Sequence, residues 1–381
     1  MKLAIVGWRP WSITQRYKSL IVNAKKLGHQ ILGIATEHFK DGPMNASLFR
    51  DLGVRYIAGG GDGLHIMGQG AVWRELDKFN PDAIFGECFW CTTEEKAARD
   101  WAIRKTGRYF VLDHTKILPL KIADFTKEPR KHFKRGLIVL TVNEINAEEK
   151  SRKYGIQTVP IGFPNFDLDY EIDIKEVKVG LEVTDQPTIA LFLMSIGNQG
   201  GALKKERERL FPLLTLAEEK GWRVFIHLHA DEQGKKYGLM NKGCPRHKFL
   251  MSLQDRGAVF VSSIPGDFNG LIFNSCGPMA LTRITDIVGG TYGVTAFQAY
   301  VAAKKYFWID AGHYPFNWEE LLNRHPNLVK VDPDYGNIVE TIEEEAGSFE
   351  QHPAYVKRWF YKLDGKCWMR MLALAEATRR R

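Results

Sequence analysis

Short runs of apolar residues alternate with amphipathic stretches from Leu3 to Ile161. The runs have the length of strands that are buried on both faces, and the stretches between them repeat apolar residues with the period of a helix. The strands predicted in this way are Leu3–Val6, Gln30–Ala35, Val54–Ala58, Ala83–Phe85, Tyr109–Leu112, Leu137–Val142 and Thr158–Ile161. The predicted helices are Thr14–Leu27, Val72–Phe79, Thr93–Thr106 and Ala147–Tyr154. This alternation is typical of a parallel sheet with helices on both faces.

The alternation stops at an acidic segment, Asn165–Gln186, which lacks helical periodicity and predicts an interdomain connection. It then restarts with strands at Thr188–Met194, Arg223–His229, Ala258–Val261 and Tyr306–Ile309, a short strand or turn at Leu281–Thr285, and helices at Lys204–Lys220 and Thr291–Lys304. We therefore expect an α/β protein with two Rossmann-like domains facing a cleft, and ligands beyond the carboxyl ends of the strands. The expected boundaries are residues 1–165 for the first domain, 166–187 for a linker, 188–350 for the second domain and 351–381 for a helical C-terminal segment.

Composition narrows the class of protein. The chain has 381 residues, of which 44% are hydrophobic and 26% charged, as in globular proteins rather than disordered or fibrous ones. No apolar run approaches the roughly 18–20 residues of a membrane span, and the N-terminus turns polar too soon for a signal peptide. Five cysteines are an odd and sparse set, which argues against a disulfide framework. These features predict a cytoplasmic protein without a transmembrane segment.

The net charge of +8 favours anionic partners. Basic residues are concentrated between residues 104 and 153, and the tightest cluster is Lys127, Arg130, Lys131, Lys134 and Arg135. This cluster could contact the phosphates of an anionic polymer or of DNA. It could equally be an ordinary solvated surface, because runs of charge often have no other role.

The second domain carries a candidate phosphate site. A Walker loop and a Gly-x-Gly-x-x-Gly motif after the first strand are both absent, which removes the usual carriers of NAD and P-loop chemistry. Gly289-Gly290-Thr291 directly precedes the predicted helix, where free backbone N–H groups could bind phosphate. Ser195 follows one predicted strand and His229 ends another, and both could contact the same group. Asp286 either belongs to this site or caps the turn below the glycines.

The first domain carries candidate acid–base residues at the ends of its strands. They are Glu87, Asp113 and His114. A histidine with a pKa near 6.5 suits general-base deprotonation of a hydroxyl, although an Asp beside a His can also be a simple turn. His227 and His229 share one face of a strand, but no third ligand is evident, so we expect no metal. The Cys88–Cys91 pair is interpreted as structural or incidental.

Several segments resemble one family in order along the chain. Gly162-Phe163-Pro164-Asn165-Phe166-Asp167 is similar to a G-[YF]-P-x-x-D segment, and Tyr361–Lys366 to a Tyr-Lys-x-Asp-Gly-Lys sequence. Asp113–Pro119 is similar to a His-Gly-Thr-Pro-Leu-Lys region without its glycine, His229 to a strand-end histidine, and Asp286–Thr291 to an Asp-Tyr-Ser-Ser turn. These motifs resemble the CDP-glycerol glycerophosphotransferases and allied surface-polysaccharide enzymes, which are nucleotide-activated transferases of the GT-B fold.

The resemblance implies two Rossmann-like domains with a C-terminal helix that crosses back to the first. It implies a UDP- or CDP-linked donor held mainly by the second domain, with no metal or other cofactor. Gln298 stands where many glycosyltransferases of this fold place a ribose-binding Glu. The implied activity is transfer of a glycosyl or alditol-phosphate group to an acceptor hydroxyl on a glycan or polymer.

Three alternatives stay open at this stage. A glycosyltransferase that modifies hydroxymethylated bases of phage DNA has the same fold, and the basic cluster would serve its phosphate contacts. An epimerase of nucleotide sugars has the same architecture but needs no large acceptor surface. A nucleotide-binding protein without catalytic activity is the third.

Overall fold

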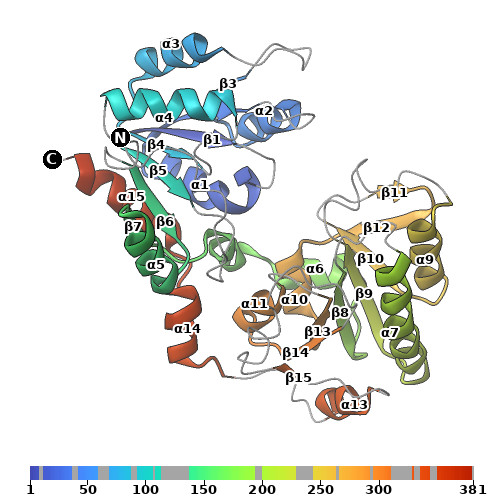
Figure 1. Cartoon of the computed structure of the whole chain (residues 1–381). Coiled ribbons are helices and arrows are strands. Elements are labelled where there is room, and N and C mark those ends of the chain that lie inside the picture. The colour runs from blue at the N-terminus through green and yellow to red at the C-terminus, as the bar shows by residue number, and fades with distance from the viewer. Residues whose placement is uncertain are drawn as a thin grey trace. The chain divides into compact units, whose positions relative to one another are not determined.

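The computed structural model describes residues 1–7, 12–36, 42–58, 68–86, 92–105, 108–112, 137–193, 200–228, 243–262, 266–291, 295–309, 328–329, 335–343 and 350–379. They form two compact units: Met1–Glu171 with His352–Arg381, and Ile172–Gln351. Each unit is a sheet covered by helices on both faces (Figure 1), so the predicted α/β class is confirmed. No helix among these residues is both long enough and apolar enough to cross a membrane.

The sheet of the first unit has seven parallel strands in the order β3-β2-β1-β4-β5-β6-β7. The strands are β1 (Lys2–Gly7), β2 (Gln30–Ala35), β3 (Arg55–Ile57), β4 (Ala83–Gly86), β5 (Tyr109–Leu112), β6 (Leu137–Thr141) and β7 (Gln157–Pro160). Strand β1 pairs with both β2 and β4, so the strand order reverses there. All seven strands fall where the sequence predicted them. The five central strands are buried along nearly their whole length, and strands of this kind are recognisable as continuous apolar runs.

The helical elements of the first unit are η1 (Ser12–Tyr17, a π-helix), α1 (Lys18–Lys26), α2 (Gly42–Asp51), α3 (Gln69–Phe79), α4 (Thr93–Lys105), α5 (Glu144–Tyr154), η3 (Pro164–Glu171, a 3₁₀-helix), α14 (Pro353–Phe360) and α15 (Cys367–Arg379). One face of the sheet packs against α1 and α15 through Leu20 and Met371. The other face packs against α3 and α4 through Leu76 and Trp101.

The C-terminal helix α15 is joined to the first unit by a capped junction. The carboxylate of Asp167 accepts hydrogen bonds from the backbone N–H groups of Cys367 (3.0 Å) and Trp368 (2.8 Å), at the first turn of α15. The Arg370 guanidinium donates to the Ile161 carbonyl oxygen at 2.6 Å. The expectation of a helix that crosses back to the first unit is therefore confirmed. The two sequence segments that end at Asp167 and Lys366 meet at this junction.

Removing the Asp167 carboxylate should loosen this junction. We expect Asp167→Ala to lower the unfolding free energy of the first unit by about 2 kcal/mol, because two backbone donors of α15 lose their acceptor. Urea denaturation, with hydrogen exchange of the α15 amides, measures the effect. Asp173→Ala is the matched control, since Asp173 caps α6 (Ile174–Gly180) of the second unit in the same way at an exposed position. Equal losses in the two variants would contradict a special role for the buried cap.

Helix α14 packs on α5 over a buried polar surface. The Asn143 side chain caps α5 by accepting from the Asn146 N–H at 2.9 Å, and it donates to the Trp359 carbonyl oxygen at 3.1 Å. Lys150 of α5 is only 4% exposed, and this burial lowers the pKa of its ammonium to about 7. A lysine with this pKa must give up its proton near neutral pH while the protein stays folded.

The buried lysine predicts that stability rises with pH. Between about pH 7 and 10.5 the unfolded chain holds the Lys150 proton and the folded chain does not, so the unfolding free energy increases by about 1 kcal/mol per pH unit. Lys150→Met should remove this slope and stabilise the first unit at pH 7. Urea denaturation at pH 7 and pH 9 checks both effects, and an unchanged slope in the variant would refute them.

The sheet of the second unit has eight strands in the order β11-β12-β10-β9-β8-β13-β14-β15. They are β8 (Thr188–Leu193), β9 (Arg223–Leu228), β10 (Val259–Ser262), β11 (Gly266–Phe268), β12 (Leu271–Ser275), β13 (Ile287–Gly290), β14 (Tyr306–Trp308) and β15 (Leu328–Val329). All neighbouring strands are parallel except the β11–β12 pair. The order reverses at β8, which pairs with both β9 and β13.

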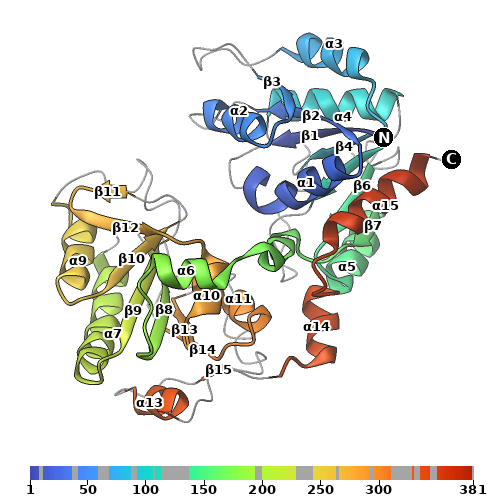
Figure 2. The same ribbon diagram turned by 180° about the vertical axis from the view of Figure 1, so that it is seen from behind.

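Alternate residues of β8 point to opposite faces of this sheet, and different helices cover each face. Leu191 packs with α7 (Gly200–Glu219), α9 (Pro245–Gln254) and α13 (Gly336–Glu343). Phe192 packs with α10 (Pro278–Ile284) and α11 (Thr295–Val301). Figures 1 and 2 show α7 and α9 side by side.

Two predicted elements of this half are wrong. Leu281–Thr285 is neither a short strand nor a turn: it holds the last residues of α10, which begins at Pro278 after the N-cap Gly277, and the C-cap Thr285. A short apolar run does not by itself distinguish a buried strand from a buried helix. The segment 165–186 is not a plain connection, since it contains most of η3 and all of α6. The three elements α10, η3 and α6 are short, so their helical periodicity is too brief to detect in the sequence.

Candidate functional site

The strand order places a candidate site at the carboxyl edge of the second sheet. In open parallel sheets, ligands bind beyond the carboxyl ends of the strands where the strand order reverses. Here the reversal lies between β8, which ends at Leu193, and β13, which ends at Gly290. Thr291 follows β13, and α11 begins at Thr295. Of the candidate phosphate residues of the second domain, Gly289, Gly290 and Thr291 belong to this part of the chain.

Gly289 and Gly290 lie in a strand and do not open a helix, which corrects the prediction. A Cβ atom on Gly289 would stand 2.2 Å from the ring of Phe307, and one on Gly290 would stand 2.8 Å from the Tyr306 hydroxyl. Both aromatic residues belong to β14, the next strand of the sheet. The two glycines are therefore required because aromatic side chains fill the space above them.

The backbone of Thr291 is also engaged within the protein. Its N–H donates to the Phe192 carbonyl oxygen at 3.1 Å, and its carbonyl oxygen accepts from the Trp308 indole at 3.1 Å. The prediction that this N–H is free for phosphate is therefore wrong. The glycines and Thr291 mark the end of β13 at the candidate edge, but they do not form an open loop of backbone donors.

Asp286 lies at the opposite edge of the same sheet. Its carboxylate accepts hydrogen bonds from the backbone N–H (2.7 Å) and the hydroxyl (2.8 Å) of Thr188, the first residue of β8. This joins the amino ends of β8 and β13. The prediction that Asp286 contacts a donor is therefore corrected: it fastens two strand starts, and ligands of parallel sheets bind at the other end.

Gln298, another predicted donor residue, lies within the described residues. It lies in the first turn of α11 and is only 8% exposed. Its side-chain oxygen is buried and has no hydrogen-bond partner among the described residues. In the neighbouring strand β14, the fully buried Tyr306 hydroxyl donates to the Gly290 carbonyl oxygen at 3.3 Å, and burial raises the pKa of this hydroxyl. A buried carbonyl oxygen without a partner is uncommon and can accept a ligand hydroxyl.

Most of the other candidate residues lie outside the described residues, and their roles stay predictions. They are Glu87, Asp113, His114, Ser195 and His229, the cysteines Cys88 and Cys91, and the basic cluster Lys127, Arg130, Lys131, Lys134 and Arg135. His227 is described, and its ring packs on Phe192 with 5.5 Å between the centroids. Within the described ranges, no three His, Cys, Asp or Glu side chains are grouped closely enough to hold a metal ion.

A cluster that the sequence analysis missed surrounds Gly86 at the carboxyl end of β4. The Tyr17 hydroxyl donates to the Gly86 carbonyl oxygen at 2.8 Å. A Cβ atom on Gly86 would stand 2.2 Å from the Tyr109 hydroxyl and 3.2 Å from a Glu95 carboxylate oxygen. Glu95 is fully buried in the first turn of α4, where its N–H donates to the Thr92 hydroxyl. The Thr-x-x-Glu spacing of a helix start was the available signal.

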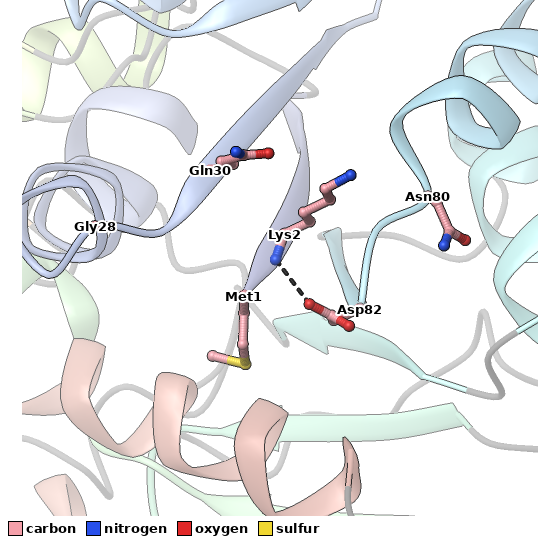
Figure 3. Close-up of a pocket in the computed structure, with 6 residues that line it drawn as sticks. All are labelled: Met1, Lys2, Gly28, Gln30, Asn80 and Asp82. Atoms are coloured by element: carbon pink, nitrogen blue, oxygen red, sulfur yellow. Dashed lines mark hydrogen bonds between the residues drawn. The ribbon is translucent and has the colours of Figure 1, made fainter.

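A pocket of about 360 Å³ opens at the amino edge of the first sheet. Met1, Lys2, Gln30 and Asp82 line it at the starts of β1, β2 and β4, and Lys2 donates its backbone N–H to the Asp82 carboxylate at 2.8 Å (Figure 3). This edge is opposite to the one where parallel sheets bind ligands. The pocket is therefore not the candidate site.

Comparison with known proteins supports the fold. No protein-family model matches the chain, and no curated protein matches its sequence. Solved structures do match over nearly the whole chain. A glycosyltransferase from Rickettsia africae is 11% identical with a TM-score of 0.59, covering 99% of this chain and 98% of its own. UDP-GlcNAc 2-epimerases from Neisseria meningitidis, bound to UDP-GlcNAc, and Methanocaldococcus jannaschii are 12% and 14% identical, with TM-scores of 0.60 and 0.61. They cover 99% of this chain and 100% of their own. The chain therefore has the GT-B fold that the sequence predicts.

Proposed function

We propose that this protein is an enzyme that binds a nucleotide-linked donor at the carboxyl edge of the second sheet. It transfers the glycosyl or alditol-phosphate group of the donor to an acceptor hydroxyl on a glycan or polymer. The solved structures of the same fold include a glycosyltransferase and an epimerase holding UDP-GlcNAc, which supports a nucleotide-sugar substrate. The segments that resemble nucleotide-activated transferases support the transfer reaction.

The buried oxygen of Gln298 is the observation that carries the donor site. Leaving a buried carbonyl oxygen without a partner costs about 1–3 kcal/mol. A ribose hydroxyl of the donor would donate to this oxygen and recover that cost on binding. Gln298 sits one turn into α11, at the edge where the strand order reverses, so the ligand would reach it from the carboxyl side.

The transfer needs a base for the acceptor. His114 takes the proton of the acceptor hydroxyl while the hydroxyl oxygen attacks the donor. The bond to the nucleotide phosphate breaks, and the nucleotide leaves with the bonding electron pair. Glu87 and Asp113 are the other candidates in the first domain for this role.

A nucleotide-sugar epimerase is the second candidate, and the solved structures favour it specifically. UDP-GlcNAc 2-epimerases match this chain across their full length with TM-scores of 0.60 and 0.61, against 0.59 for the glycosyltransferase. An epimerase interconverts the donor without an acceptor. A transferase releases nucleotide only when the acceptor hydroxyl is present.

One assay separates the transferase from the epimerase and from the other two alternatives. The protein is incubated with a panel of UDP- and CDP-linked donors, with and without a glycan acceptor or hydroxymethylated duplex DNA. Nucleotide release that requires the glycan supports the proposal, and release that requires the DNA supports base modification. A new sugar isomer formed without an acceptor supports the epimerase. No change in any donor, with nucleotide binding intact, would favour a binding protein without catalytic activity.

The donor site is tested at Gln298. We expect Gln298→Leu to weaken nucleotide binding about threefold to tenfold, as the loss of one buried hydrogen bond predicts. Gln298→Glu keeps an oxygen acceptor and should bind better than the leucine variant. Calorimetric titration with UDP and CDP measures both. The melting temperature of Gln298→Leu should not fall, because the free protein loses no hydrogen bond, and unchanged nucleotide affinity would overturn the assignment.

A further inference from the structure

A cavity outside the candidate site opens between the N-terminal half of α7 and the helix α9. Its volume is about 530 Å³, within the usual range of roughly 300–1,000 Å³ for small-molecule sites. The two helices lie side by side on the second sheet (Figures 1 and 2). They cover the face of the sheet opposite to α10 and α11. The residues of the proposed donor site are not among the described residues that line this cavity.

Three cations line the cavity. Lys204 and Arg207 come from α7, and Lys248 comes from the facing helix α9. Glu208 is the exposed carboxylate on this part of α7, and it lies 3.8 Å from the Lys204 ammonium. Glu206 is fully buried in an ion pair with Arg246 and does not offset the charge in the cavity. An excess of positive charge therefore faces the opening.

The start of α9 adds to this positive potential. Gly243 lines the cavity just before the helix, and the next residue, Cys244, is its N-cap. The Cys244 sulfur accepts the His247 N–H at 3.3 Å, which is a weak cap. The remaining first-turn N–H groups and the helix dipole favour an anion at this end.

The floor of the cavity is apolar. Leu203, Pro245 and Phe249 line it beside the cations. The Phe249 ring is 6% exposed and packs on Phe211 with 6.0 Å between the centroids. Ser252 also lines the cavity, and its hydroxyl already donates to the Phe249 carbonyl oxygen at 2.6 Å. A small inorganic anion would leave this floor uncovered.

We propose that this cavity binds a phosphate group carried on an apolar organic group. The phosphate lies among Lys204, Arg207 and Lys248, and the apolar group covers Leu203 and Phe249. Cations that converge from two helices suit a group with two negative charges better than a single carboxylate. The proposal does not depend on the activity of the donor site.

The test compares phenyl phosphate with inorganic phosphate by calorimetric titration at low salt. We expect phenyl phosphate to bind about tenfold more tightly, because its ring buries apolar surface on the floor. Lys248→Gln should weaken its binding about threefold to tenfold. Lys205→Gln removes the same charge from an exposed position of α7 outside the cavity and should change binding less than twofold. Leu203→Ala should reduce the preference for phenyl phosphate over inorganic phosphate.

A vesicle-binding experiment distinguishes a lipid headgroup from a soluble organophosphate as the source of the phosphate. Sedimentation with phosphatidylcholine vesicles, with and without phosphatidic acid, tests a lipid headgroup. Binding that needs phosphatidic acid and is lost in Lys248→Gln supports the site with a lipid ligand. Binding of phenyl phosphate alone supports the site with a soluble organophosphate. Equal affinities of Lys248→Gln and Lys205→Gln for phenyl phosphate, or no binding at about 10 mM, would overturn the proposal. Unchanged melting temperatures of the variants show that they remain folded.

Discussion

His114→Ala should lower the rate of the proposed transfer by about 10²–10⁴-fold while leaving nucleotide affinity unchanged. A positioned base acts on the acceptor hydroxyl in the transition state and makes no contact with the nucleotide, so the loss appears in kcat. His114 follows β5 by two residues in the chain, and β5 is parallel to the strands that flank the reversal of the first sheet. Steady-state nucleotide release with a saturating donor and acceptor measures the effect.

The matched control is His29→Ala. His29 lies at the amino edge of the first sheet, where its ring nitrogen is 2.9 Å from the Met1 amino group. The removal of this imidazole should leave the transfer rate unchanged. Full activity of His114→Ala would assign the role of base to Glu87 or Asp113, and equal losses in both histidine variants would point to a general effect on folding.

Gly289→Ala should strongly destabilise the second unit. The added methyl group would stand 2.2, 2.5 and 2.6 Å from three atoms of the Phe307 ring, which is fully buried between neighbouring strands. Overpacking of this kind costs about 1–3 kcal/mol, and we expect the upper end because the ring has no room to move. For a unit of this size the melting temperature should fall by about 5–10 °C.

Gly201→Ala is the control for this effect. A Cβ atom on Gly201 of α7 meets nothing within 4 Å. Alanine favours a helix over glycine by up to about 1 kcal/mol, so this variant should be as stable as the wild type or more so. Calorimetry measures the melting temperatures of both variants. An unchanged melting temperature of Gly289→Ala would mean that the glycine serves a ligand rather than the packing of β13 on β14.

The sequence by itself determined the two sheets. Leu3–Val6 and Thr188–Leu193 are buried on both faces of their sheets. A strand of this kind needs apolar side chains on both faces, so it is a continuous apolar run in the sequence. Such a run can be recognised without knowing which strands it pairs with. The local sequence pattern also predicted the long helix α7, because its apolar residues repeat with the helical period over many turns. Gln298 is singled out instead by the resemblance to glycosyltransferases of this fold, which place a ribose-binding Glu at the corresponding point.

Only the tertiary structure decided the details of the sites. The need for glycine at Gly289 comes from Phe307, which is far along the chain but adjacent in the sheet. Asp286 binds the start of a strand 98 residues away, so its place at the amino edge depends on strand order rather than on neighbouring residues. Asp167 caps a helix that begins 200 residues later. Each of these roles is created by a contact between distant segments, and the local pattern of hydrophobic and polar residues carries no record of such contacts.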